Sequence, residues 1–136
     1  FYKKLKANSN LKEVLNEILL LILLFVIVGV LIFSLMDVLF YLLVSSDFQL
    51  AKEYFPWLLL GFLFQSIYFL SANFLFYYRK TKILAAITVL GACINIICNY
   101  LGIIYFGVIG VAYATSLTWG VFLFVTVYYN YNYNFA

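Results

Sequence analysis

The chain has 136 residues, of which 68% are hydrophobic and only 10% are charged, and its formal net charge is +3. Soluble domains are about half apolar and about a quarter charged, so this composition excludes an ordinary soluble domain and predicts an integral membrane protein. At about 20 residues per crossing, the length allows four membrane-spanning helices with short connections and no separate soluble domain.

The polar residues do not form a nucleic-acid surface or a catalytic group. The basic residues flank the predicted spans, a position typical of topology determinants, so we predict no nucleic-acid partner. The chain has no histidine, no paired carboxylates on one face, no phosphate-binding glycine loop and no nucleophile elbow. Cys93 and Cys98 are five residues apart, and we interpret them as buried packing residues. We therefore predict no enzyme activity, no cofactor and no metal site.

The first predicted span covers about residues 15–44 and follows a helix start signal. Asn10 precedes Leu11, and Glu13 comes three residues after Asn10, a spacing that resembles a capping box. A continuous helix over Leu11–Val44 would be about 50 Å long at 1.5 Å per residue. Because the bilayer core is only about 30 Å thick, we expect this helix to tilt or to extend beyond the membrane.

Three further spans complete a single transmembrane bundle over residues 1–136. We place them at about residues 56–78, 83–105 and 108–129. Pro56 falls in the first turn of the second span, where a helix accepts proline. Phe106 and Gly107 are expected to form a tight turn. The uncharged tail after Tyr129 repeats Tyr-Asn, and we expect it to lie at the membrane interface or to fray.

The positions of lysine and arginine predict the orientation. Seven of the eight basic residues fall on one side of an even number of spans: Lys3, Lys4, Lys6, Lys12, Arg79, Lys80 and Lys82. Only Lys52 falls on the other side. By the positive-inside rule, both termini and the basic turn (residues 79–82) are predicted to be cytoplasmic. The connector at 45–55 and the turn at 106–107 are then expected to face outward.

Small and polar residues follow one another along the third span at steps of four and three. They form what we call the polar stripe: Thr81, Ala85, Thr88, Ala92, Asn95, Asn99 and Gly102. Such steps fall on one face of a helix, so we predict that the polar stripe faces other helices. In the fourth span, one row comprises Gly110, Ala114 and Thr118, and a second comprises Ala112, Ser116 and Gly120. We interpret both rows as helix-packing positions. The two asparagines of the third span are expected to form hydrogen bonds between helices or, alternatively, to line a hydrophilic cavity.

Asp37 is the only acidic residue inside a predicted span beyond Glu17, which lies at the start of the first span. One hypothesis is an ion- or proton-coupling site, because an acid within the membrane is costly and often functional. The interpretation that we favour places Asp37 at the outer interface, capped by Ser34 or Tyr41, since about 19 uncharged residues precede it and nearly cross the core. The basic turn is similarly open to two interpretations, a topology signal or a binding site for lipid headgroups or a pyrophosphate.

The most specific pattern lies in residues 79–118. The basic turn with its Lys-Thr-Lys core (80–82) leads into a helix with Asn95 and Asn99, and the run Phe-Gly-Val-Ile-Gly-Val-Ala-Tyr-Ala-Thr-Ser (106–116) opens the next helix. This pattern resembles the C-terminal part of the polysaccharide flippases, the O-antigen and related repeat-unit transporters. These belong to the multidrug/oligosaccharidyl-lipid/polysaccharide exporter superfamily. Within Gly107–Thr115, only Val111 departs from the family pattern, which usually has alanine at this position.

The resemblance implies a fragment of a multi-pass inner-membrane protein. The chain would supply the last four helices of a two-lobe, MATE-like transporter of about 12 to 14 helices. Such a protein flips lipid-linked oligosaccharides across the cytoplasmic membrane by alternating access, for polysaccharide biosynthesis. Its partners would be membrane lipids, the missing N-terminal lobe and the lipid-linked substrate. We assign no substrate-binding residue, because the family's charged cavity residues lie mainly on other helices. The alternatives are a MATE-type drug or cation antiporter and a four-span structural subunit that transports nothing.

Overall fold

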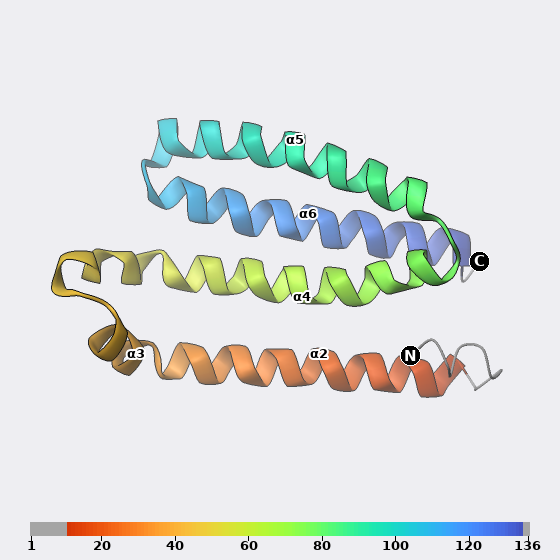
Figure 1. The fold of residues 1–136 in the computed structure, drawn as a ribbon, viewed down its shortest axis with the longest axis horizontal. Helices are drawn as coiled ribbons and strands as arrows, with labels where there is room; N and C mark the ends of the chain where they lie inside the picture. The colour runs from red at the N-terminus through yellow and green to blue at the C-terminus, as the bar shows by residue number, and fades with distance from the viewer. Residues whose placement is uncertain (1–10, 135–136) are drawn as a thin grey trace.

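The computed structural model describes residues 11–134, and their elements are all helical (Figure 1). In chain order these elements are α2 (Leu11–Ser34), α3 (Met36–Leu43), the 3₁₀ helix η1 (Ser46–Glu53), α4 (Phe55–Tyr77), α5 (Thr81–Phe106) and α6 (Ile109–Asn134). Within residues 11–134, four helices are long and apolar enough to cross a membrane, over Asn16–Ser34, Phe55–Tyr77, Thr81–Phe106 and Ile109–Asn132. This confirms the predicted all-α class with four membrane-spanning helices.

The four long helices lie side by side in the order α2, α4, α6, α5 (Figure 1). Helix α6 is central, because it packs against α4 on one side and α5 on the other. Helices α4 and α6 run in the same direction, and α2 and α5 run in the opposite one. The start of α2, the α4–α5 turn and the end of α6 therefore lie at one end of the bundle. The α5–α6 turn, α3 and η1 lie at the other end.

A small core closes between α4, α5 and α6. Its buried residues are Tyr68, Ala72, Leu75, Leu84, Ile87 and Phe122. Leu75 is fully buried, whereas α2 leaves most of its apolar side chains exposed. Lipid tails are as apolar as these side chains, so the helices gain little from hydrophobic burial alone. Close packing and hydrogen bonds between helices must therefore hold the bundle together.

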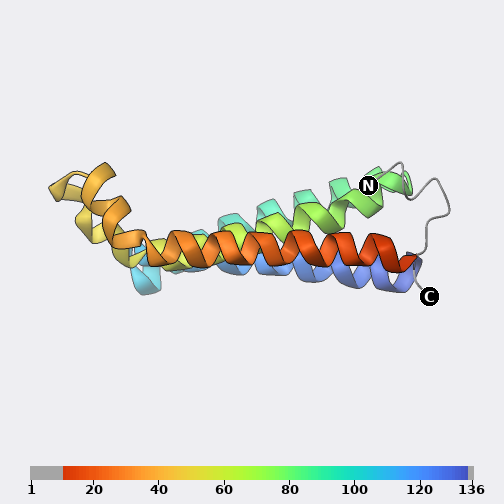
Figure 2. The same ribbon diagram turned by 90° about the horizontal axis from the view of Figure 1, so that it is seen from below.

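The first predicted span is divided in the structure. Instead of one helix over Leu11–Val44, α2 ends at Ser34 and α3 begins after Leu35, whose φ of −92° and ψ of 4° depart from helical values. Ser34 Oγ donates a hydrogen bond to the carbonyl oxygen of Val30 at 2.8 Å, and back-bonding of this kind often bends helices. Helix α3 then turns out of the line of α2 (Figure 2), so a bend accommodates the excess length.

The α4–α5 turn is closed by a Schellman motif. Arg79 has a φ of 56°, the left-handed conformation that usually falls to glycine at this position. The Lys80 N–H donates to the carbonyl oxygen of Leu75 at 2.8 Å, and the Arg79 N–H donates to that of Phe76 at 3.0 Å. These bonds satisfy carbonyls that the end of α4 would otherwise leave without partners. At the other end of α4, Pro56 lies in the first turn, as predicted.

The α5–α6 turn depends on a glycine. Gly107 has a φ of 70° and a ψ of −149°, a region that is essentially restricted to glycine. The turn expected at Phe106 and Gly107 forms one residue later, at Gly107 and Val108, because Phe106 is still part of α5. The Gly110 N–H then donates to the carbonyl oxygen of Gly107 at 3.0 Å and starts α6.

The C-terminal tail is helical through Asn134, although the sequence predicted that the span ends near Tyr129. Asn130 is only 5% exposed, and its Nδ2 donates to the carbonyl oxygen of Ser71 on α4 at 2.9 Å. The Lys80 ammonium lies 5.4 Å from the centre of the Tyr129 ring, within the range of a cation–π interaction. These contacts fix the tail to α4 and to the basic turn, so α6 continues.

Candidate functional site

A chain of hydrogen bonds between α5 and α6 forms the polar interior of the bundle. Asn99 Nδ2 donates to Asn95 Oδ1 at 2.9 Å, and Asn95 Nδ2 donates across the helix contact to Thr118 Oγ1 at 3.2 Å. Thr118 is 3% exposed and donates to the carbonyl oxygen of Ala114 at 2.7 Å. Asn99 Oδ1 is buried and accepts no hydrogen bond within the part of the chain that the structure describes. Asn95 thus joins two helices, and Asn99 supports Asn95 from within α5.

The polar stripe divides into two halves. Asn95 and Gly102 contact α6 and Asn99 bonds to Asn95, but the first four members, Thr81 to Ala92, are exposed. The hydroxyl of Thr88 donates to the carbonyl oxygen of Leu84 in its own helix at 2.9 Å. The stripe repeats every 3.5 residues, and an α-helix has 3.6 residues per turn, so the stripe rotates by about 20° per heptad around the helix. Asn95 and Gly102 thus meet a helix of this chain, and the contact with other helices expected for the first four members stays a prediction.

The buried residues in the first half of α5 are Leu84, Ile87 and Gly91, which precede stripe positions by one residue. Cys93 is exposed rather than buried as predicted, and Cys98 is half-buried. The exposed half of α5 therefore presents small and apolar side chains that no described helix covers.

Glycines bring α5 and α6 into backbone contact near their connecting turn. A Cβ atom added to Gly110 would lie 2.0 Å from the carbonyl oxygen of Gly102, and one added to Gly102 would lie 2.6 Å from that of Gly110. Further along α5, a Cβ on Gly91 would lie 1.9 Å from Cζ of Phe122. The ring of Phe122 therefore fills the space that the missing side chain leaves. These contacts leave no room for larger residues.

Helix α6 has small residues on two faces, which explains its central place. Gly110, Ala114 and Thr118 are buried and form the row that contains the contacts to α5. In the second row, Ser116 lies against Gly61 of α4, where an added Cβ would lie 3.3 Å from Cα of Ser116. Of the two rows identified in the sequence, the first thus packs against α5 and the second against α4.

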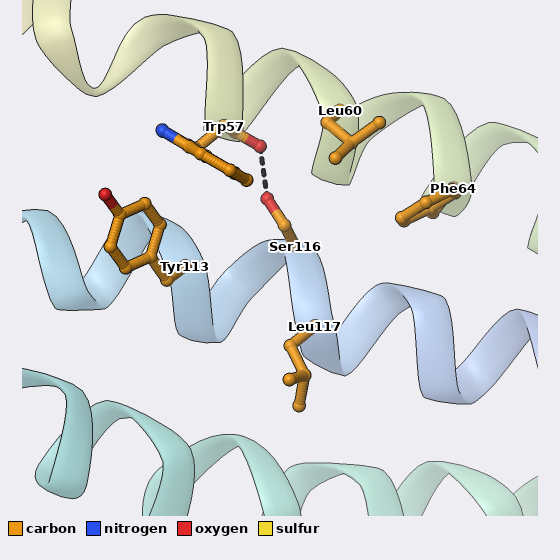
Figure 3. A pocket seen from close by; sticks show the side chains of 6 residues that line it. All are labelled: Trp57, Leu60, Phe64, Tyr113, Ser116 and Leu117. Carbon is orange, nitrogen blue, oxygen red and sulfur yellow. Dashed lines mark hydrogen bonds between the residues drawn. The ribbon is translucent and has the colours of Figure 1, made fainter.

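An apolar groove lies between α4 and α6 toward the end that carries α3 and η1 (Figure 3). Its volume is about 390 Å³, and it is lined by Trp57, Leu60, Phe64, Tyr113, Ser116 and Leu117. Ser116 Oγ lies within hydrogen-bond distance of the carbonyl oxygen of Trp57 and, at 3.1 Å, of that of Ala112, and its single proton can be donated to either. The rings of Trp57 and Tyr113 meet edge to face with centroids 4.7 Å apart. Sequence reasoning missed this pairing, because no local pattern links Trp57 to Ser116.

Asp37 lies beyond the end of the first membrane-spanning stretch. It belongs to the first turn of α3, its side chain is 78% exposed, and it forms an ion pair with Lys52 of η1. Ser34 does not cap Asp37, because its hydroxyl bonds to Val30. Tyr41, the other suggested partner, is 85% exposed. The carboxylate is thus placed at one end of the bundle and is neutralised by a cation of the adjoining element.

The basic turn lies at the opposite end, beside the start of α2 and the end of α6 (Figure 1). Arg79 and Lys82 are exposed, and Lys80 is half-buried over Tyr129. The expectations for Lys3, Lys4, Lys6 and Asn10, and for the side chains of Lys12 and Glu13, fall outside the described residues. Among the described residues, no group of three His, Cys, Asp or Glu side chains could hold a metal ion.

The comparison with known families is decisive for the class of protein. Residues 6–101 match the MatE family, and this range is more than half of the chain. The chain belongs to the MatE family. Proteins of the MatE family are membrane transporters, so this MatE chain is a transporter segment with four apolar helices that could cross a membrane. No curated protein and no solved structure matches the chain significantly.

The family match and the sequence resemblance overlap over only residues 79–101 of the MatE chain. The match extends from the start of α2 through most of α5 and stops before Gly102. The run at 106–116, which carried most of the resemblance to polysaccharide flippases, lies beyond it. The match therefore identifies the family without selecting the flippase branch.

Proposed function

We propose that this MatE chain is part of a transporter that moves lipid-linked oligosaccharide units across the membrane by alternating access. The position of Asp37 carries this proposal over a cation antiporter. An antiporter for organic cations needs a carboxylate in its membrane cavity, whereas Asp37 lies on α3 and is paired with Lys52. Over the four spanning stretches, the single acidic residue is Glu17, the second residue of the stretch Asn16–Ser34.

The hydrogen-bonded side chains between α5 and α6 carry no charge. The amides of Asn95 and Asn99 and the hydroxyl of Thr118 are uncharged groups that both donate and accept hydrogen bonds. In this proposal they hold α5 against α6 within one lobe. The basic turn faces the cytoplasm, and helices elsewhere in the protein complete the cavity for the glycan.

A transport assay with the full-length protein in liposomes tests the proposal. A fluorescent lipid-linked oligosaccharide should reach the opposite leaflet in the presence of the protein, and a cationic dye should not be exported. Asp37→Asn should leave glycan transport unchanged, because the carboxylate lies outside the spanning helices. Export of the dye without glycan transport would instead assign a cation antiporter. Loss of that dye export in Asp37→Asn would support the same assignment. Transport of neither compound would favour a structural subunit.

A further inference from the structure

The chain between α2 and α4 forms a distinct unit, the elbow, which comprises α3 and η1 (residues 36–53). It follows directly on the membrane-spanning stretch that ends at Ser34 and leads directly into the one that begins at Phe55. Because both neighbours cross the membrane, the elbow lies at a bilayer surface in either orientation of the chain. Helix α3 turns out of the line of α2 and runs across the long axis of the bundle (Figures 1 and 2).

Two side-chain hydrogen bonds and an ion pair form within the elbow. Gln49 Nε2 donates to the carbonyl oxygen of Phe40 at 3.2 Å and to that of Val44 at 3.0 Å, both at the C-terminal end of α3. Carbonyls at a helix end otherwise need water or another donor. The ion pair between Asp37 and Lys52 joins α3 to η1 and lowers the cost of moving either charge into a less polar medium. The hydrogen bonds of Gln49 and this ion pair thus lower the free-energy cost of moving these carbonyls and these two charges out of bulk water.

The apolar side chains of the elbow point outward. The exposed ones, from 52% to 85% exposed, are Val38, Tyr41, Leu42, Leu43, Phe48 and Leu50. Phe40 is the exception among the aromatic residues of α3, because it is buried and packs edge to face on Phe55 with centroids 5.5 Å apart. This contact fixes the elbow to the start of α4, so the outward apolar side chains are presented in a defined place.

We propose that the elbow is an interfacial anchor that inserts Tyr41, Leu42, Leu43 and Phe48 into the boundary between headgroups and acyl chains of the phospholipid bilayer. The bilayer is the occupant because exposed apolar side chains extend along the chain from the spanning helix α2, through Phe33 and Leu35, and resume after Asp37 in the elbow. Exposed apolar side chains of this kind are typical of a helix that lies along a membrane surface and buries them by about 5–10 Å. This inference does not depend on the substrate.

Nitroxide depth measurements on the full-length protein test the anchor. The protein, with Cys93, Cys98 and any other cysteine changed to serine, is reconstituted in phosphatidylcholine–phosphatidylglycerol liposomes. Spin labels are attached in turn to Leu42→Cys and Phe48→Cys, with Glu53→Cys, an exposed polar position of η1, as the matched control. Collisions with oxygen and with a water-soluble nickel chelate, calibrated with labelled lipids, give the depth of each label.

We expect oxygen to dominate at positions 42 and 48, with depths of about 5–10 Å below the phosphates, and nickel to dominate at position 53. Nickel access at Leu42→Cys equal to that at Glu53→Cys would place the elbow in water. Low access to both reagents would show that protein covers it, a second copy or another part of the same chain. Either result overturns the anchor. As a second variant, Lys52→Met should move the Leu42→Cys label toward water, and Lys52→Arg should leave its depth unchanged.

Discussion

Gly107 and Arg79 both hold positive φ angles next to a helix end, but only one of them is a glycine. At Gly107 the backbone occupies a region that side chains with a Cβ atom rarely enter, although nothing lies within 4 Å of an added Cβ. The restriction is thus in the backbone and not in the packing. At Arg79 the conformation is left-handed, which arginine tolerates at a cost that glycine would not incur.

We expect Gly107→Ala and Arg79→Gly to shift stability in opposite directions. Gly107→Ala should lower the free energy of unfolding by about 1–3 kcal/mol, because alanine is strained in this region. Arg79→Gly should raise it by about 0.5–1 kcal/mol, after the loss of chain entropy that glycine brings to folding. Thermal unfolding of the full-length protein in detergent measures both. A shift of the same sign in the two variants would refute the assignment of strain to these turns.

The two asparagines of the polar interior, Asn95 and Asn99, should contribute unequally to the stability of the folded protein. Asn95→Leu removes the bond to Thr118 and the bond from Asn99, whereas Asn99→Leu removes only the latter. Each hydrogen bond within a membrane is worth about 0.6–1.7 kcal/mol, so Asn95→Leu should lower the melting temperature more. Asp37→Asn serves as the control and should change it little, because its ion pair is exposed. Equal effects of Asn95→Leu and Asp37→Asn would contradict this hierarchy.

At the scale of elements, long apolar runs were sufficient to predict four helices, because each run must satisfy its backbone within itself to cross the membrane. The break at Leu35 was not predictable, since neither glycine nor proline marks it and the bend involves a serine hydroxyl bonded to the preceding turn. The exposure of the first half of the polar stripe within this chain was not predictable either. Residue spacing places side chains on a face but does not say along how much of the helix a neighbour touches that face.

The close contact of α5 and α6 gives an element-scale prediction with an internal control. Gly110→Ala should separate the helices near the turn and destabilise the protein by about 1–3 kcal/mol, because the new Cβ would overlap a backbone carbonyl. Gly120→Ala, on the same helix, should be neutral or stabilising, since its Cβ would meet Phe64 at an ordinary 3.5 Å. Unfolding in detergent distinguishes the two. Similar destabilisation by both would indicate a general intolerance of α6 to side chains.

At the scale of the whole molecule, the basic turn and the elbow mark opposite ends of the bundle (Figure 1). Charge counting predicts the end with the basic turn to be cytoplasmic. The order in which the helices pack, α2, α4, α6, α5, was not predictable from the sequence. Rows of small residues show that a helix can approach another closely, and they do not name the partner.

Labelling of single cysteines in intact cells tests the orientation. Lys82→Cys and Glu53→Cys both place an exposed thiol at a bundle end, in the full-length protein without Cys93 and Cys98. A membrane-impermeant maleimide should label position 53 from outside, and position 82 only after the cells are opened. The reverse pattern would invert the assignment. Labelling of both positions from outside would mean that α4 does not cross the membrane.

The central place of α6 has a consequence for biogenesis. This helix is the last of the four to leave the ribosome, yet it separates α4 from α5 and supplies both of them with their closest contacts. Helices α4 and α5 must therefore enter the bilayer before the helix that fits between them exists. Their small-residue surfaces remain open to lipid, or to an insertion chaperone, until synthesis passes Asn134. The packing of these three helices thus waits for the synthesis of α6, as a result of the topology itself.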